Sequence, residues 1–148
     1  MDVIPQHWRA GRAAGAVIAV EGRGYLLQLR DRYEGIWYPG YWGLFGGTAK
    51  RGESAETALR RELAEELSLA DAEMRYFMSM SFDFASASAR RIRRDLFEVR
   101  LPPRAIGRLR LGEGRAMRCW RARDIPRLRL IPADRAVLDF HASQDRWA

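Results

Sequence analysis

Three glutamates of this 148-residue chain are spaced so that they can act together on a cation. Glu62, Glu65 and Glu66 lie within five consecutive positions, so in a helix their carboxylates fall within about one turn of each other. Carboxylates at this spacing repel one another, at a cost of roughly a few tenths of a kcal/mol per pair. Hard divalent cations prefer oxygen ligands and would remove this cost. The spacing therefore indicates a metal site, although solvated helices on which Glu and Arg offset each other show a similar pattern.

Two features near the glutamates favour the metal site. Gly46 and Gly47 allow a tight backbone turn that would expose a carbonyl oxygen beside the start of the helix. Glu53 and Arg61 lie eight positions apart, which corresponds to roughly 12 Å along a helix axis. They can therefore pair directly only if Glu53 lies in a loop that folds back on the helix.

The element that must position these residues is a helix predicted over residues 53–67. Ala55, Leu59, Leu63 and Leu67 recur at every fourth position and form an apolar stripe beside the carboxylates. We expect this stripe to face the core, which would leave the glutamates along its border.

The other segments predict a β-sheet. Residues 16–20 and 25–29 are β-rich and flank a glycine-containing turn, which indicates an antiparallel hairpin. Alternating apolar residues between Met74 and Phe84 predict a half-buried strand, or a pair interrupted by a bulge. Further expected elements are a loop over 31–40, a short strand at 42–45 ended by Gly46 and Gly47, a turn at 86–89, strands at 95–101 and 116–121, and a final helix from Pro132. This order predicts an α/β (α+β) fold in which a mixed sheet packs between helices.

Residues 47–69 resemble the Nudix box, the loop–helix–loop signature of hydrolases that act on nucleoside diphosphates linked to another moiety. Every fixed position of that box is present except one, because Ser68 stands where the family usually has glycine. The flanking residues 25–30 and 41–47 also resemble this family, and the similarity extends across most of the chain. The resemblance implies a single Nudix domain over residues 1–148.

The resemblance also implies roles for the residues of the box. Glu62, Glu65 and Glu66 would bind Mg²⁺ or Mn²⁺, and the Gly46 carbonyl would add a ligand. Glu53 and Arg61 would brace the loop. The metal would neutralise phosphate charge and polarise a water that attacks phosphorus, which divides the substrate into two phosphorylated fragments.

The general base of such a reaction stays open on sequence alone. Glu65 is one candidate, and Asp95, Glu98 and Glu113 are others because the family also draws a base from a distant loop. Glu113 is preferred since glycines flank it on a loop that precedes a strand.

Substrate contacts are expected just before the box. Trp37 and Tyr41 are candidates for stacking on a nucleobase, whereas Trp42 opens a strand and is expected to pack. Arg30 and Arg32 could contact phosphate through charge-assisted hydrogen bonds. The expected substrate is a small nucleotide derivative, namely a nucleoside triphosphate, a nucleotide sugar or a dinucleotide.

Three positions depart from the pattern of the family. A left-handed cap at Ser68 would cost roughly 1 kcal/mol, or the helix would end in another way. Lys50 stands where many relatives have an acid, and Phe45 replaces a frequent proline. Loop chemistry and substrate preference are therefore the properties that the family pattern predicts least well.

Arginine supplies nearly all of the positive charge. Lys and Arg total 26 against 19 Asp and Glu, for a net charge of +7, and Lys50 is the only lysine. This charge favours polyanionic partners, although a solvated arginine-rich surface would show it too. Two alternatives to a nucleotide hydrolase remain open, a non-catalytic nucleotide- or RNA-binding module on a Nudix scaffold and an RNA 5′-end pyrophosphohydrolase. The family resemblance also allows a homodimer.

Cysteine and histidine contribute little to the expected chemistry. The lone Cys119 excludes an intramolecular disulfide and is expected to be a buried structural thiol. His7 and His141 lie in polar sequence surroundings that suggest neither a ligand nor a catalytic dyad. The apolar stretch 13–20 is too short to span a bilayer, so no membrane partner and a cytoplasmic protein are expected.

Overall fold

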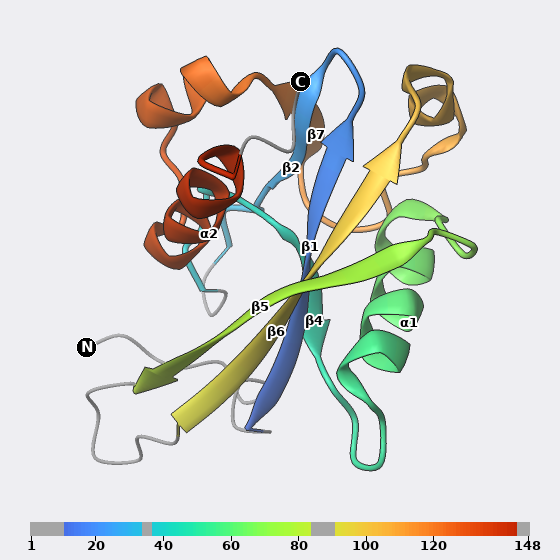
Figure 1. The fold of residues 1–148 in the computed structure, drawn as a ribbon, viewed down its shortest axis with the longest axis vertical. Helices are drawn as coiled ribbons and strands as arrows, with labels where there is room; N and C mark the ends of the chain where they lie inside the picture. The colour runs from blue at the N-terminus through green and yellow to red at the C-terminus, as the bar shows by residue number, and fades with distance from the viewer. Residues whose placement is uncertain (1–10, 34–36, 84–90, 145–148) are drawn as a thin grey trace.

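The computed structural model describes residues 11–33, 37–83 and 91–144, which form a β-sheet with helices on both faces (Figure 1). The elements are β1 (Arg12–Val20), β2 (Gly24–Leu29), β3 (Trp42–Gly43), β4 (Phe45–Thr48), α1 (Ala55–Leu67), β5 (Met74–Asp83), β6 (Arg91–Leu101), the 3₁₀ helix η2 (Pro103–Arg108), β7 (Ala116–Trp120), the 3₁₀ helix η3 (Ala122–Arg127) and α2 (Pro132–Ala142). The predicted α+β fold, hairpin and C-terminal helix are confirmed.

The sheet is mixed and has β1 near its centre. Its strand order is β3-β2-β1-β6-β5, and β4 and β7 are added by pairing with β1 and β2. Only the β1–β6 pairing is parallel among the strands described, running from Arg12 beside Arg93 to Val20 beside Leu101. This long parallel pairing explains why β1 and β6 both begin several residues before the predicted positions 16 and 95.

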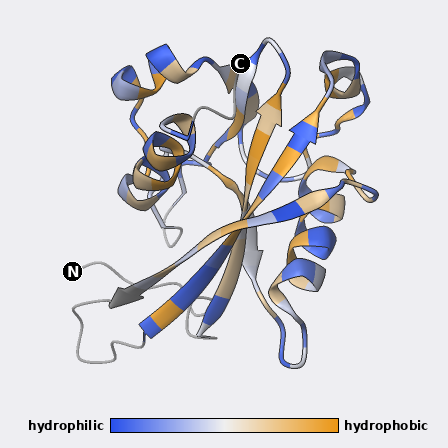
Figure 2. Ribbon diagram, viewed as in Figure 1, coloured by the Kyte–Doolittle hydropathy of each residue, from blue (hydrophilic) through white to orange (hydrophobic). Residues whose placement is uncertain are grey.

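Two apolar layers cover the two faces of the sheet. Successive residues of β1 point to opposite sides, so Ile18 packs in the layer beneath α1 and Val17 in the layer beneath α2. The predicted stripe of α1, namely Ala55, Leu59, Leu63 and Leu67, is buried in the first layer. Figure 2 shows the result, since orange and blue residues alternate along α1 while the upper half of β1 is mainly orange.

Helix α1 begins later than predicted. Ser54 is its N-cap and accepts a hydrogen bond from the Thr57 amide, so Glu53 lies in the loop before the helix. At the other end Ser68 takes the left-handed conformation with φ 56°, and its amide donates to the Ala64 carbonyl at 3.0 Å. The serine therefore caps the helix in the way that glycine usually does.

The strand predicted at 42–45 is two strands, and the expectation that Gly46 and Gly47 end it is wrong. The chain is interrupted at Leu44, whose amide donates to the Asp134 carboxylate at 2.9 Å instead of joining the sheet. Strand β4 then continues through both glycines, which pair with Gly15 and Ala14 of β1. Tertiary pairing thus overrides the tendency of glycine to end a strand.

The predicted bulge occurs in β5, where the register shifts between Tyr76 and Met78. Met74 consequently packs against the α1 layer, whereas Met78 and Met80 pack against the α2 layer. The prediction of one half-buried face is therefore wrong beyond the bulge, because the extra residue reverses which side each side chain occupies. Phe84 and the turn predicted at 86–89 lie outside the described residues.

His141 is fully buried, contrary to its polar sequence surroundings. Its two ring nitrogens lie 2.7 Å from the Tyr25 hydroxyl and 2.6 Å from Glu98 Oε2, which ties α2 to the sheet. Cys119 is half-buried and packs against the α1 layer, and burial raises the pKa of its thiol. Across the described ranges, no helix is both long and apolar enough to cross a membrane.

Candidate active site

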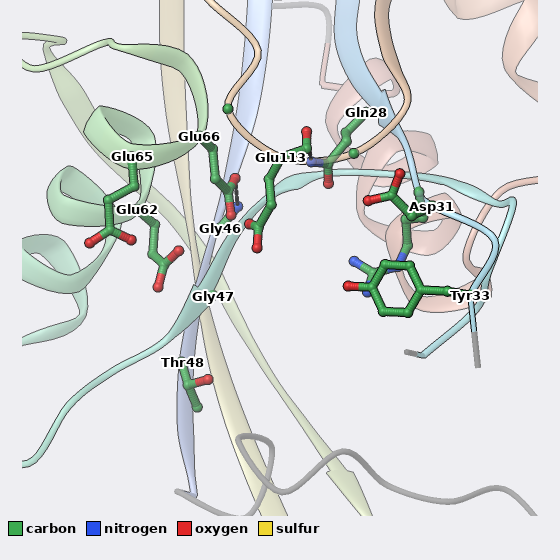
Figure 3. A pocket seen from close by; sticks show the side chains of 13 residues that line it. Gln28, Asp31, Tyr33, Gly46, Gly47, Thr48, Glu62, Glu65, Glu66 and Glu113 are labelled. Atoms are coloured by element: carbon green, nitrogen blue, oxygen red, sulfur yellow. Dashed lines mark hydrogen bonds between the residues drawn. The ribbon is translucent and has the colours of Figure 1, made fainter. Parts of the chain in front are cut away.

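The glutamates of α1 line a cavity of about 480 Å³. Figure 3 shows Glu62, Glu65 and Glu66 on one wall, Asp31 and Tyr33 after β2 on the opposite wall, and β4 residues between them. Among the described residues, five carboxylates line this cavity against one guanidinium, that of Arg30, in a chain whose net charge is +7. The residues in this list are Asp31, Glu62, Glu65, Glu66 and Glu113. The acidic charge is therefore concentrated locally against the overall balance of the chain.

The three helix carboxylates differ in their exposure because of their place around α1. Glu66 precedes Leu67 of the apolar stripe and is only 4% exposed, whereas the side chain of Glu65 is 58% exposed. Glu62 lies between them, with its side chain 16% exposed. The cluster thus reaches from solvent into the protein interior.

Glu53 and Arg61 form the predicted pair, with Glu53 in the loop that folds back on α1. Arg61 donates from Nε and Nη2 to the two carboxylate oxygens at 3.0 and 2.9 Å, which is a bidentate arrangement. The same guanidinium donates to the Thr48 carbonyl at 3.1 Å and to Glu62 Oε1 at 2.9 Å. Arg61 therefore joins the loop, the end of β4 and one of the cavity carboxylates.

Hydrogen bonding also fixes the charge states of this pair. The hydrogen bonds from Arg61 and from the Lys50 amide lower the pKa of Glu53 to about 2. The pKa of Arg61 is raised above its ordinary value, mainly by its hydrogen bond to Glu53. Both groups stay ionised at any physiological pH, so they can brace the site but exchange no proton there.

Other groups approach Gly46 and Gly47 closely, and at Gly46 the close group is backbone, so a side chain is excluded there. Gly46 has φ +142°, and a Cβ there would lie 2.2 Å from the Ala14 carbonyl oxygen. A Cβ on Gly47 would lie 2.6 Å from the carboxyl carbon of Glu62. The Gly46 amide donates to Glu66 Oε2 at 3.2 Å, so its amide is the group seen in contact with a glutamate, and a metal-binding role for its carbonyl stays a prediction.

Glu66 is the most perturbed acid of the cavity. Burial, together with the negative charges of Glu62 and Glu113, raises its pKa to about 9, although the Gly46 amide acts in the opposite direction. A buried carboxylate without a cation to balance it favours the protonated form. Such a group is stabilised by a bound cation, which favours its ionised form instead.

The loop that carries Glu113 is held over the end of α1. The Gly112 amide donates to the Glu66 carbonyl at 2.7 Å, and the Arg115 amide donates to the Leu29 carbonyl at 2.9 Å. Between them, Gln28 Nε2 donates to the Glu113 carbonyl at 2.8 Å. Gln28 was not predicted as a site residue, although a glutamine inside the apolar strand Gly24–Leu29 indicates a polar role.

The other two base candidates lie outside the cavity and are engaged elsewhere. Asp95 accepts hydrogen bonds from Ser79 at 2.5 Å and Arg93 at 3.1 Å. Glu98 is bonded to His141 and to Arg100. Within the part of the chain that the structure describes, Glu65 and Glu113 are the base candidates that face the cavity.

The predicted substrate contacts divide into three groups. Arg30 lines the acidic cavity and Trp37 lines a smaller adjoining one, whereas Arg32 and Tyr41 line neither. Tyr41 instead packs on Tyr38 and beneath the Arg129 guanidinium. Asp31 and Tyr33 were not predicted, because the chain after β2 shows no motif and only the fold brings it opposite α1.

Comparison with known families identifies this arrangement. A family model described as NUDIX domain matches residues 9–141, which is most of the chain. The chain belongs to the Nudix family. It is accordingly a Nudix hydrolase, and the resemblance stated from residues 47–69 is confirmed. A comparison with curated protein sequences finds no match.

Solved structures share the fold of this Nudix hydrolase. A MutT Nudix hydrolase from Burkholderia pseudomallei is 25% identical, with a TM-score of 0.70 over 86% of this chain and 95% of that one. The dihydroneopterin triphosphate pyrophosphohydrolase of E. coli is 19% identical, with a TM-score of 0.71 over 87% and 92%. An Ap4A hydrolase from C. elegans is 17% identical, with a TM-score of 0.68 over 89% and 95%.

Nudix hydrolases generally use a divalent metal, and the residues of this cavity fit one. The donors are carboxylate oxygens, which hard cations prefer, and buried Glu66 lacks a balancing positive charge. Among the described residues, however, no three acidic, histidine or cysteine side chains are arranged so that they could hold a metal ion as they stand. Glu62 Oε1 accepts a hydrogen bond from Arg61 at 2.9 Å, and Glu62 also lies beside Glu66, so Arg61 and an ion would share this carboxylate.

Proposed function

We propose that this Nudix hydrolase uses Mg²⁺ to cleave a diphosphate linkage in a small nucleotide-type substrate. The supporting observation is the cavity of five carboxylates and one guanidinium at the Nudix box. Glu62, Glu65 and Glu66 would hold the ion, which when bound neutralises phosphate charge and increases the acidity of a water molecule.

The residues of the chain would then perform separate tasks around the diphosphate. Arg30, the cation of the cavity, would donate hydrogen bonds to a phosphate oxygen. Glu113 would accept a proton from the attacking water, whose oxygen forms a bond to phosphorus as the bond to the bridging oxygen breaks. The bridging oxygen leaves with the second phosphorylated fragment.

Glu113 suits the role of base better than Glu65 does. Its loop is fixed by hydrogen bonds from Gly112, Gln28 and Arg115, so its backbone is held in place before a substrate arrives. Glu65 lies 3.7 Å from the Arg61 guanidinium, which favours its role as a ligand or a surface charge.

The shared fold of two neighbours supports the substrate class. One is named for hydrolysis of a pterin triphosphate and the other for hydrolysis of Ap4A. Both substrates contain phosphoanhydride linkages, which is the feature that an acidic, metal-loaded cavity would recognise.

The test is a substrate panel of nucleoside triphosphates, nucleotide sugars, dinucleotides and triphosphorylated RNA, assayed with Mg²⁺, with Mn²⁺ and with excess EDTA. Glu66→Gln should lower turnover by on the order of 10³-fold. Glu56→Gln on the same helix should not, because Glu56 is exposed and pairs only with Arg60 among the described contacts. Equal turnover by wild type and Glu66→Gln would contradict the proposal, and hydrolysis restricted to triphosphorylated RNA would replace the small substrate with an RNA end.

A further inference from the structure

Tyr33 is an exposed aromatic residue on the wall opposite the glutamates. Among the described residues, three large hydrophobic side chains are exposed, Tyr33 at 60%, Tyr76 at 56% and Phe140 at 48%. Only Tyr33 of these three lines the acidic cavity. Figure 3 shows its ring across the cavity from Glu62 and Glu65, below Asp31.

The exposure of Tyr33 is not explained by packing. Tyr76 is nearly as exposed, but its ring lies edge-on to Phe97 at 5.9 Å and its hydroxyl is 2.6 Å from Ser79. Phe140 packs at 5.5 Å on Phe77. In the described ranges Tyr33 has neither a ring partner nor a hydrogen bond, so its aromatic face remains available to a ligand.

The aromatic residues further along the same loop are already occupied. Trp37 packs on Tyr38 at 4.9 Å, and Tyr38 packs on Tyr41 at 5.1 Å. Arg30 donates its Nε hydrogen to the Trp37 carbonyl at 2.6 Å, which fixes the guanidinium on the same side as Tyr33. This wall therefore combines a free aromatic ring, a fixed cation and the carboxylate of Asp31.

We propose that Tyr33 stacks on the nucleobase of the substrate, with Arg30 beneath the adjoining phosphate. A base presents a flat π-face that an aromatic side chain can cover, and such stacking tolerates different bases. The cavity of about 480 Å³ has the size of an ordinary small-molecule site. Because the glutamates would hold the ion that binds the diphosphate on the other wall, this inference rests on the proposed function.

If Tyr33 stacks on the base, its removal should affect only ligands that carry a base, which neither charge nor shape alone would produce. Replacing Tyr33 by leucine should weaken binding of a ligand that has a base by about tenfold. It should weaken binding of inorganic tripolyphosphate much less, because that ligand carries the phosphates without a ring. Tyr33→Phe should retain most of the affinity, since the ring is the part that acts.

The experiment measures dissociation constants of ATP, GTP, CTP, UTP and tripolyphosphate by equilibrium dialysis in which Ca²⁺ replaces Mg²⁺ to slow hydrolysis. It compares the wild-type protein with Tyr33→Leu, Tyr33→Phe and the matched control Tyr76→Leu, and checks folding by circular dichroism. The expected result is a tenfold fall in the preference for nucleotide over tripolyphosphate in Tyr33→Leu alone. An unchanged preference in Tyr33→Leu, or equal losses in Tyr76→Leu, would overturn the inference, as would failure of the wild-type protein to bind any of the four nucleotides.

Hydrolysis measured on the same samples keeps the two proposals apart. Turnover that depends on Glu66 with no Tyr33 effect would leave the proposed function intact and remove the stacking role. Nucleotide binding that depends on Tyr33, without turnover, would support the stacking role and contradict the proposed hydrolysis.

Discussion

Glu66 and Glu98 are buried to nearly the same extent, at 4% and 3% exposure, but they lie in opposite electrostatic surroundings. Glu66 on α1 faces the carboxylates of Glu62 and Glu113, and its pKa is raised to about 9 by burial and by these charges. Burial also acts to raise the pKa of Glu98 on β6, but hydrogen bonds from His141 and Arg100 outweigh it, so that pKa is lowered.

The difference shows that burial alone does not distinguish a structural acid from a functional one. Each carboxylate oxygen of Glu98 has a hydrogen-bond partner, at 2.6 Å to His141 and 2.7 Å to Arg100. Among the described residues, Glu66 is held by the Gly46 amide and by contact with the Glu62 carboxyl, and its charged neighbours are acids. A buried carboxylate whose charge no protein cation balances is a candidate functional group, because a bound cation could balance it.

Removing the charge of Glu66 or of Glu98 should have the largest and most different effects. Glu66→Gln should lower kcat by on the order of 10³-fold, about 4 kcal/mol, because a ligand of the ion that neutralises the phosphate charge is lost. Its thermal stability without metal should be unchanged or higher. Glu98→Gln should instead lower the free energy of unfolding by roughly 1–3 kcal/mol. Steady-state kinetics and urea unfolding on both variants give the two readouts, and a stability loss in Glu66→Gln equal to that of Glu98→Gln would erase the distinction.

A second paired acid extends the comparison to α2. Asp134 is 2% exposed and forms an ion pair with Arg94 while it accepts the Leu44 amide at 2.9 Å. Arg94→Met should cost about 3 kcal/mol of unfolding free energy, because it leaves the Asp134 carboxylate buried without its cation. The neighbouring Arg93→Met, whose side chain is 60% exposed, should cost less than about 1 kcal/mol. Urea unfolding measures both values, and similar losses would show that burial of the pair contributes nothing.

The sequence predicts the helix side of the cavity better than the opposite side. The stripe of α1 and the spacing of Glu53 and Arg61 depend on local geometry, which a helix repeats at every turn, and both predictions agree with the structure. Gln28 and Tyr33 join the cavity only because β2 pairs with β7 and ends opposite α1, and such tertiary placement leaves no local pattern.

Long-range pairing also explains the errors in the strands. Gly46 and Gly47 have the composition of a strand end, but their backbones pair with β1. Likewise, the sequence around His141 is polar, yet its position on α2 turns the ring toward Glu98 and Tyr25. Each partner lies tens of positions away in the chain, where residue spacing carries no information about contact.

The pH dependence of stability should separate the two buried glutamates. A folded pKa raised above 4.5 means that the native protein holds the Glu66 proton more tightly, so metal-free stability should fall as pH rises from 4.5 to about 9. The lowered pKa of Glu98 has the opposite sign, and its contribution should be lost as pH falls below 4.5. We call the fall in stability between pH 4.5 and 9 the alkaline loss, and we expect it to be at least ~1.4 kcal/mol, the equivalent of one pKa unit.

Thermal melts from pH 3 to 9 in EDTA would measure both losses. Mg²⁺ or Glu66→Gln should flatten the alkaline side, and Glu98→Gln should flatten the acid side. An alkaline loss that persists in Glu66→Gln would assign it to another group.

The smallest effect is expected at Ser68, two residues after Glu66, where the helix ends with φ 56°. A side chain in this left-handed conformation costs roughly 1 kcal/mol relative to glycine. Ser68→Gly should therefore raise the free energy of unfolding by up to about 1 kcal/mol, reduced in part because glycine also gains entropy in the unfolded chain. The backbone amides of residues 68 and 69 would still donate their hydrogen bonds to the carbonyls of Ala64 and Leu63, because these bonds do not involve the side chain.

Ser68→Gly also tests whether the position of the Glu66 carboxylate depends on the conformation at the end of α1. Since the carboxylate is held by burial and by the Gly46 amide, kcat and the alkaline loss of stability should stay at their wild-type values. Ser68→Ala is the matched control, because it keeps a side chain in the left-handed conformation and should show none of the gain. A change in kcat in Ser68→Gly but not in Ser68→Ala would mean that the cap conformation, and not only the surrounding charge, determines where Glu66 lies.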